Sequence, residues 1–298
     1  MNGISKNQVS SYVSSIAGEL FYVRHGSASG APLVVIHGGP GFTCYALEPL
    51  FALSECFPVV AYDQAGCGRS RDRCPDRRDH SISGFVAELE ALRIHLGAPK
   101  IRLLGHSFGG LIAGEYALLY PERVEAIVFA CVSIDIPRWI ADAQRLISGL
   151  PMMTKMILRE GLRTGACSSP AFLDAYSVYI KKHIYGFDEK PQSIIRSELE
   201  SDHKTYQIVW GQNEMAVTGV VKDYNLCDRL PLIAAPSLFI CGRNDEATPE
   251  AHEHFASLIP GARCHIFESS AHHPQITERD EYLRVVGGFL RKVGKTYP

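Results

Sequence analysis

The sequence predicts an α/β fold in which a mostly parallel β-sheet is flanked by helices and carries a helical insertion. Short apolar runs alternate with segments of helical periodicity over the first 132 residues, in the order strand, strand, helix, strand, helix, strand. Several of these runs are apolar throughout, which is typical of parallel strands buried on both faces. The pattern stops near residue 134 and resumes after residue 231, so the stretch between is expected to be an insertion.

The expected strands follow in chain order. Residues 19–24 alternate between apolar and polar side chains and are predicted to form an edge strand. The other strands are predicted where apolar residues are continuous, at 32–36, 57–62, 101–104, 124–132, 237–241 and 264–267. Phe85, Leu89, Leu92 and Leu96 recur at helical spacing and predict an amphipathic helix that packs on the sheet. Further helices are expected over 113–120, from Pro249, and over 278–293.

The composition is that of an ordinary globular protein. Of 298 residues 46% are hydrophobic and 21% charged, and the net charge of −2 provides no basic field for nucleic acid or anionic lipid. We therefore expect neither a nucleic-acid partner nor a membrane partner, and no apolar run approaches the ~18 residues of a membrane span. The polar, serine-rich start at 1–17 does not resemble a secretion signal.

The nine cysteines are scattered and form no CxxC pair. Their odd number argues against a complete disulfide framework, and we expect a cytoplasmic protein. Cys67, in a glycine-rich loop, is the most exposed-looking of them and is interpreted as a bystander.

The domain organisation follows from the interrupted pattern. Residues 1–133 and 232–298 are predicted to form the α/β core, and 134–231 a helical cap over the edge of the sheet where α/β proteins bind ligands. The cap carries an aromatic and methionine stripe, which we interpret as packing between its own helices: Met152, Met153, Met156, Phe172, Tyr176 and Tyr179.

The run Gly105-x-Ser107-x-Gly109 lies between a predicted strand and a predicted helix. Glycines on both sides of a serine allow the sharp turn of a nucleophile elbow, which presents the hydroxyl at the end of the sheet. The pattern alone is a weak signal, and its position between strand and helix is what favours the functional interpretation.

A serine nucleophile needs a base, and the base needs an acidic residue to orient it. Ser107, Asp245 and His272 supply these residue types in the chain order Ser, Asp, His, and the last two lie in loops after late strands. Parallel strands bring such loops to one end of the sheet. His273 is the alternative base. The oxyanion hole is expected from the backbone N–H groups of Phe108 and of the glycine-rich run 37–41, most directly Gly39.

With these features, the chain resembles the α/β-hydrolase superfamily, and within it the proline iminopeptidase group with its tricorn-interacting aminopeptidase relatives. The resemblance rests on five stretches: the HGGPG run at 37–41, DQxGxGxS at 63–70, GHSxGG at 105–110, the run from 209 through 224, and GRxDExTP at 242–249. It covers the chain from about residue 18 to residue 290. The sequence departs from the group at Gln212, where proline is common, and in the first half of the cap.

The resemblance implies Ser107 as nucleophile, Asp245 as orienting residue and His272 as base, because the ungapped spacing from Ser270 to Tyr282 selects His272 over His273. It also implies that Glu214 and Glu246 bind the free amino group of the substrate. Trp210, in the same stretch as Glu214, is included among the expected substrate-binding residues.

The expected function is that of a serine aminopeptidase or amidase that removes an N-terminal proline or another small or apolar residue through an acyl-enzyme. Its partner is a small peptide or an amino-acid amide, and no cofactor or metal is expected, since His252 and His254 face different ways on a helix. One alternative is an esterase or thioesterase with the same catalytic groups. Another is a non-catalytic ligand receptor. An epoxide hydrolase or dehalogenase is disfavoured, because those chemistries use an aspartate where this chain has Ser107.

Overall fold

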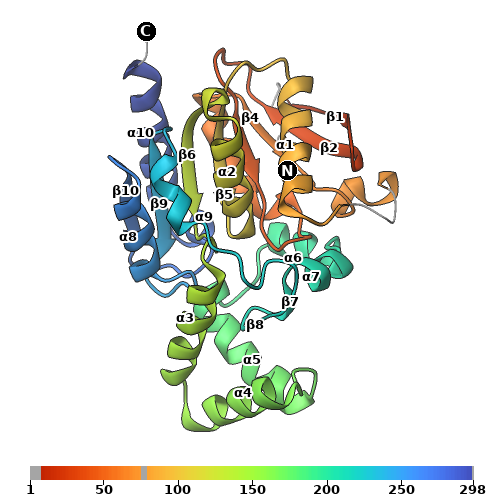
Figure 1. Cartoon of the computed structure of the whole chain (residues 1–298), viewed down its shortest axis with the longest axis vertical. Coiled ribbons are helices and arrows are strands. Elements are labelled where there is room, and N and C mark those ends of the chain that lie inside the picture. The colour runs from red at the N-terminus through yellow and green to blue at the C-terminus, as the bar shows by residue number, and fades with distance from the viewer. Residues whose placement is uncertain (1–7, 75–78, 297–298) are drawn as a thin grey trace.

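An eight-stranded sheet forms the centre of the molecule in the computed structural model, which describes residues 8–74 and 79–296 (Figure 1). Its strand order is β1-β2-β4-β3-β5-β6-β9-β10, and the six strands from β4 to β10 are parallel. The predicted α/β fold with a mostly parallel sheet is therefore confirmed. The strands are β1 Gln8–Ser15, β2 Gly18–His25, β3 Leu33–Ile36, β4 Val59–Tyr62, β5 Ile101–His106, β6 Val124–Ala130, β9 Ser237–Gly242 and β10 Arg263–Phe267.

The antiparallel edge differs from the prediction. β2 was expected to be an edge strand, but β1 pairs with it from Gln8 opposite His25 to Ser15 opposite Gly18, so β2 lies inside the sheet. Most side chains of β1 are exposed and only Val13 is buried, so this strand has no apolar pattern. It is held by its backbone ladder to a neighbouring strand, which composition does not reveal.

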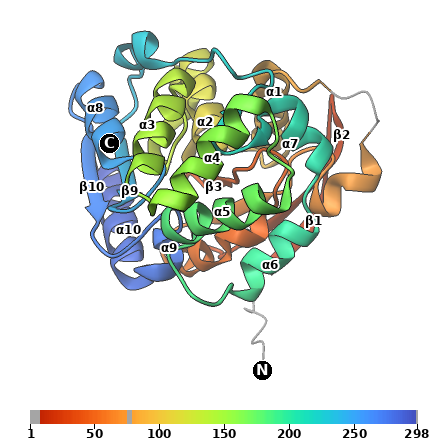
Figure 2. The same ribbon diagram turned by 90° about the horizontal axis from the view of Figure 1, so that it is seen from below.

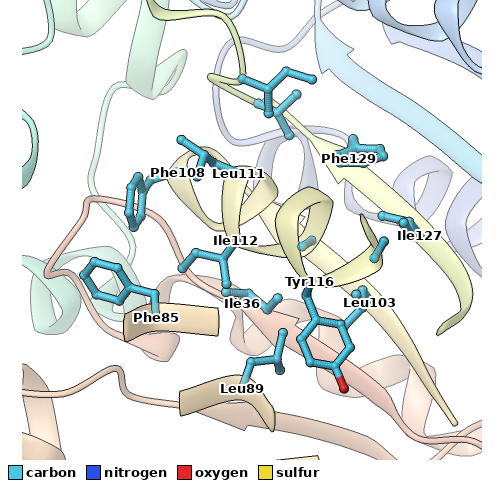
Figure 3. Packing of buried hydrophobic residues seen from close by; sticks show 14 of the residues in the cluster. Ile36, Phe85, Leu89, Leu103, Phe108, Leu111, Ile112, Tyr116, Ile127 and Phe129 are labelled. Carbon is cyan, nitrogen blue, oxygen red and sulfur yellow. The ribbon is translucent and has the colours of Figure 1, made fainter. Parts of the chain in front are cut away.

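Side chains of successive residues in the parallel strands point to opposite faces of the sheet and pack into two separate hydrophobic clusters. In β3, Val34 and Ile36 pack into one hydrophobic cluster, whereas Leu33 and Val35 pack into the other. The first cluster is covered by α1 (Ile82–His95), α2 (Phe108–Leu119) and α8 (Pro249–Leu258), and Figure 3 shows part of its packing around α2. The second is covered by α10 (Arg279–Thr296) and by η1 (Cys44–Glu55), a helix that was not predicted. Burial on both faces explains why these strands read as continuous apolar runs.

The segment between β6 and β9 lies mostly at the end of the sheet where the parallel strands terminate, but its last helix, Cys227–Leu232, packs beside α2 and α8 (Figures 1 and 2). It is mainly helical, but it also contains a two-stranded hairpin where no strand was expected. Its elements are α3 Ile136–Ser148, α4 Met152–Thr164, α5 Pro170–Ile180, the π-helical turn η4 Lys181–Tyr185, α6 Gln192–Leu199, α7 His203–Val209, β7 Gly211–Asn213, β8 Ala216–Val217 and η5 Cys227–Leu232.

The aromatic and methionine stripe does not pack as one unit. Phe172 and Tyr179 are buried in a small cluster of the cap, but the three methionines of α4 are between 57% and 67% exposed. The interpretation of the whole stripe as internal packing was therefore wrong, because helical spacing does not tell which face a neighbouring helix covers.

Two further expectations concerned the cysteines and a membrane-spanning helix. All nine cysteines are free thiols, and Cys67 is fully buried rather than exposed, with its thiol 3.0 Å from the Gln64 carbonyl oxygen. Among the described residues, no helix is both long and apolar enough to cross a membrane.

Candidate active site

Ser107 occupies the turn between β5 and α2 in a strained backbone conformation, with φ 55° and ψ −125°. Its N–H donates to the carbonyl oxygen of Ala130 on the adjacent β6, at 2.9 Å. Gly109 permits the close approach of α2 to β3, because a Cβ there would lie 2.3 Å from the carbonyl oxygen of Ile36. Ser107 therefore sits at the N-terminal end of α2, where the helix dipole favours developing negative charge.

Asp245 and His272 meet although they come from different loops. The Asp245 loop joins β9 to α8, and the His272 loop joins β10 to the short helix α9 (Pro274–Thr277). His272 Nδ1 donates to Asp245 Oδ1 at 2.7 Å, and the same oxygen accepts the N–H of Ala247 at 2.8 Å. The side chain that caps α8 is Thr248, so Asp245 is not needed as a helix cap.

The electrostatics of this pair suit an orienting carboxylate and a base. Burial raises the pKa of Asp245, but the neighbouring His272 outweighs it, so the net pKa of the carboxyl is lowered. Burial likewise lowers the pKa of His272, but the Asp245 carboxylate and, less strongly, Glu214 raise it above its ordinary value. Asp245 thus stays ionised and stabilises the protonated form of His272.

His273 has a different environment. Its Nδ1 lies 3.2 Å from the Gln275 side-chain nitrogen, and its ring stacks on His106 at 5.5 Å between centroids. Burial holds the pKa of His273 well below its ordinary value. The structure therefore pairs Asp245 with His272 and leaves His273 as a neutral ring in the cavity wall.

The glycine-rich loop after β3 lies against Ser107. A Cβ on Gly38 would lie 2.7 Å from Ser107 Cβ and 3.3 Å from Ser107 Oγ, so this position has no room for a side chain. His37 fixes the loop, since its Nδ1 donates to the Gly38 carbonyl oxygen and its Nε2 accepts the N–H of Gln64. Gly39 lines the same cavity as Ser107, and Phe108, the other residue expected in the oxyanion hole, is the first residue of α2.

Glu214 reaches the site from the turn between β7 and β8. Tyr206 donates its hydroxyl to Glu214 Oε1 at 2.8 Å, and the Glu214 N–H donates to the Tyr176 hydroxyl at 3.2 Å. Burial raises the pKa of the Glu214 carboxyl to about 7, although the Tyr206 hydrogen bond and His272 oppose the rise.

Glu246 follows Asp245 and is almost completely buried. Burial, and then the proximity of Glu214 and Asp245, raise the pKa of its carboxyl well above the ordinary value. Among the residues that the structure describes, Glu246 Oε2 has no hydrogen-bond partner, and no lysine or arginine forms an ion pair with Glu246 or Glu214. Two mutually repelling carboxylates without a cation are costly in a protein interior.

These groups share one cavity of about 50 Å³, lined among others by Gly38, Gly39, Ser107, Glu214, Glu246 and His272. It adjoins a recess of about 300 Å³, and the two have Phe42, Ala46, Ile184, Glu214 and His273 in common. The remaining wall of the recess contains Tyr176, Tyr185 and Tyr206. Two larger hollows involve Gly30, Lys100 and Glu125, and neither contains any of the groups described above.

The structure does not bring every expected residue to the cavity. Trp210 is 1% exposed, belongs to the main hydrophobic core and packs edge-on against Trp139, and it is not among the residues that line the cavity or the recess. Sequence reasoning missed Tyr176 and Tyr206, the tyrosines that contact Glu214. Tyr176 was noticed only as part of a packing stripe, and nothing in the sequence around Tyr206 pointed to Glu214.

One group of potential metal ligands occurs in the described part of the chain. Donor atoms of Cys131, Asp245 and His272 lie within 4.8 Å of one another, and all three residues are buried. Burial raises the pKa of the Cys131 thiol well above its ordinary value, which keeps it protonated beside Asp245. A metal ion here would have to replace the 2.7 Å hydrogen bond between Asp245 and His272.

Comparison with known proteins gives consistent matches. The model of the alpha/beta hydrolase fold matches residues 31–279. The proline iminopeptidase of Heyndrickxia coagulans is 37% identical over 270 residues, which are 90% of this chain and 93% of the relative. That of Saccharolobus solfataricus is 34% identical over 98% of this chain and 96% of its own. The crystal structure of the Mycobacterium smegmatis proline iminopeptidase superposes with a TM-score of 0.85 at 29% identity, covering 96% of this chain and 98% of that one.

Proposed function

Because this chain belongs to the alpha/beta hydrolase fold family, and within it to the proline iminopeptidase group, it is a hydrolase, and we propose that it removes an N-terminal amino acid from short peptides or amino-acid amides. The observation that carries the proposal is the pair of buried carboxylates, Glu214 and Glu246, that line the same cavity as Ser107. A substrate ammonium group is the cation that this pair lacks.

In the proposed reaction, Ser107 Oγ attacks the carbonyl carbon of the N-terminal residue while His272 takes its proton. The oxygen that becomes negative is bound by the N–H groups of Gly39 and Phe108. Asp245 stabilises the protonated His272, which then gives its proton to the departing amine. Water, deprotonated by His272, hydrolyses the acyl-enzyme and restores Ser107.

The size and lining of the two spaces support a small or apolar first residue. With the amino group at Glu214 and Glu246 and the carbonyl carbon at Ser107, a small residue such as proline fits the cavity of about 50 Å³, and a longer apolar side chain extends into the adjoining recess. We also propose that residues 1–133 and 232–298 form the core domain and 134–231 the cap that supplies Glu214.

The test is a panel of amino-acid arylamides, each with a free and with an N-acetylated amino group. We expect the free amides to be cleaved at least ~30-fold more efficiently, because loss of one partner of a buried charge pair costs about 2–5 kcal/mol. Glu214→Gln and Glu246→Gln should remove most of this difference and leave hydrolysis of p-nitrophenyl acetate nearly unchanged. Equal cleavage of free and acetylated amides by the wild type would favour an esterase or thioesterase. Failure to react with a fluorophosphonate would favour a non-catalytic receptor.

A further inference from the structure

The π-helical turn η4 connects the cap to both loops of the proposed acid–base pair. It continues α5 and ends at Gly186, which has a φ of 67°. The last carbonyl groups of a helix have no partner inside the helix and are free to accept from elsewhere. π-helical turns are rare, and many of those that are found lie at functional sites.

Two consecutive carbonyl groups of η4 accept from the two loops. The N–H of Glu246 donates to the His183 carbonyl oxygen at 3.2 Å, and the N–H of His272 donates to the Ile184 carbonyl oxygen at 3.1 Å. One turn of the cap therefore fixes the backbone of the residue next to Asp245 and the backbone of His272 itself.

The side chain of His183 adds a third contact. Its Nδ1 donates to the carbonyl oxygen of Asn244, the residue before Asp245, at 2.8 Å. His183 is 3% exposed, and burial lowers its pKa, so the ring is neutral and has one N–H to donate. Within the described ranges its Nε2 has no hydrogen-bond partner, which is consistent with the proton being on Nδ1.

We propose that His183 is a positioning residue of the catalytic site: through Asn244 it holds the Asp245 loop in the place where Asp245 meets His272. This inference rests on the proposed function of Asp245 and His272. The two loops also touch each other, since the Asn244 N–H donates to the Ser270 carbonyl oxygen at 3.0 Å. η4, on the cap side, holds the two loops together through its hydrogen bonds to both of them.

The same helix also contacts the proposed amine site. Tyr176, one turn before Tyr179 on α5, accepts the N–H of Glu214, and the ring of Tyr179 lies 5.1 Å from that of His183. The segment from Tyr176 to Ile184 thus contacts the cap glutamate and both catalytic loops. Catalytic groups must be held within about 0.5 Å of their productive geometry, which gives such a clamp a direct effect on rate.

The test compares His183→Leu, which loses the donor, with His183→Asn, whose amide nitrogen takes about the place of Nδ1. Tyr224→Phe is the matched control: it removes another cap-to-core hydrogen bond, from the Tyr224 hydroxyl to Glu115 on α2, without touching either loop. The substrate is p-nitrophenyl acetate, which needs no amine site. We expect His183→Leu to lower kcat at least about tenfold with KM little changed, and His183→Asn and Tyr224→Phe to stay within about threefold of wild type.

The acid limb of the kcat/KM pH profile is the second readout, because it reports the ionisation of the base. In the wild type Asp245 raises the pKa of His272, so a displaced Asp245 should move the limb of His183→Leu to lower pH. A purely structural role for His183 would lower thermal stability without moving this limb. Within the described part of the chain, the titratable groups that interact with His272 are Asp245, Glu214, Cys131, His106, His252 and His273.

If His183→Leu does not fold, His183→Gln replaces it, since its amide nitrogen lies near the position of Nε2 instead of Nδ1. The inference is wrong if the donor-deficient variant keeps wild-type kcat and an unmoved limb while a fluorophosphonate still labels Ser107. It is also wrong if His183→Asn is as impaired as His183→Leu. If Ser107 is not labelled in the wild type, the proposed function fails, and the inference fails with it.

Discussion

Replacing Glu214 by glutamine should stabilise the protein at alkaline pH while impairing its proposed activity. Burial raises the pKa of Glu214 from 4.5 to about 7, so the native state binds a proton more tightly than the unfolded chain does. Stability contributed by that proton is present at pH values below 4.5 and is lost as the pH rises through 7. Above pH 7 the ionised, buried carboxylate therefore destabilises the native state relative to a neutral side chain.

The magnitude follows from the interval between the two pKa values. Each pH unit corresponds to about 1.4 kcal/mol, so the cost at pH 8.5 is on the order of 3 kcal/mol. Unfolding entropies of about 2.1 cal/mol/K per residue convert this into a rise in Tm of roughly 5 °C for Glu214→Gln. The glutamine keeps an oxygen that accepts from Tyr206, so the geometry of the turn is expected to persist.

The assay is thermal unfolding by circular dichroism at pH 4.5 and pH 8.5. Glu214→Gln should exceed the wild type by roughly 5 °C at pH 8.5 and by less than about 1 °C at pH 4.5. Glu55→Gln, at an exposed position at the end of η1, is the matched control and should differ little at either pH. A Glu214→Gln variant that is no more stable than wild type at pH 8.5 would refute the reasoning, because Glu214 would then have a compensating partner and no need of a substrate cation.

Three further predictions concern the elbow and the base. Ser107→Ala should lower kcat by about 10⁴-fold or more. Intact-protein mass spectrometry should show one fluorophosphonate adduct in the wild type and none in the variant, whereas labelling at another serine would disprove the assignment. His272→Ala should be nearly inactive and His273→Ala should keep most of its activity, because only His272 contacts Asp245; the reverse order would identify His273 as the base. Gly38→Ala should lower kcat at least about tenfold, since its Cβ would displace Ser107, while Gly288→Ala, where a Cβ meets open space, should leave kcat unchanged; equal effects would argue against the close approach of Gly38.

The parts of the fold predicted from sequence are those in which local pattern and tertiary burial agree. β3, β5, β6 and β9 are buried on both faces, so their apolar runs identified them without knowledge of their partners. β1 escaped prediction because its residues are mostly exposed and its stability comes from pairing with β2. The irregular helix η1 contains Pro49 and was missed for a similar reason, since its local sequence does not favour a regular helix.

The candidate site was likewise predicted only in part. Ser107, Asp245 and His272 lie at the ends of strands, and parallel strands bring their loops to one edge of the sheet, so chain order was enough to group them. Contacts that depend on how the cap folds onto the core were not accessible. The hydroxyl of Tyr206 on Glu214 and the carbonyl groups of η4 under the two loops arise from the packing of separate helices, which no spacing in the sequence encodes.

The direct pairing of β6 with β9 has a consequence for the order in which the molecule folds. Ile127 lies opposite Ser237, so the sheet can be completed only after the whole segment between these strands has been synthesised. The entropic cost of closing a loop rises by only about 0.6 kcal/mol for each doubling of its length, so the length of this segment affects stability little. Non-local pairings do slow folding, however. On the ribosome, Ser107 emerges long before Asp245 and His272, so the proposed nucleophile lacks its proposed base until the last two parallel strands have joined the sheet.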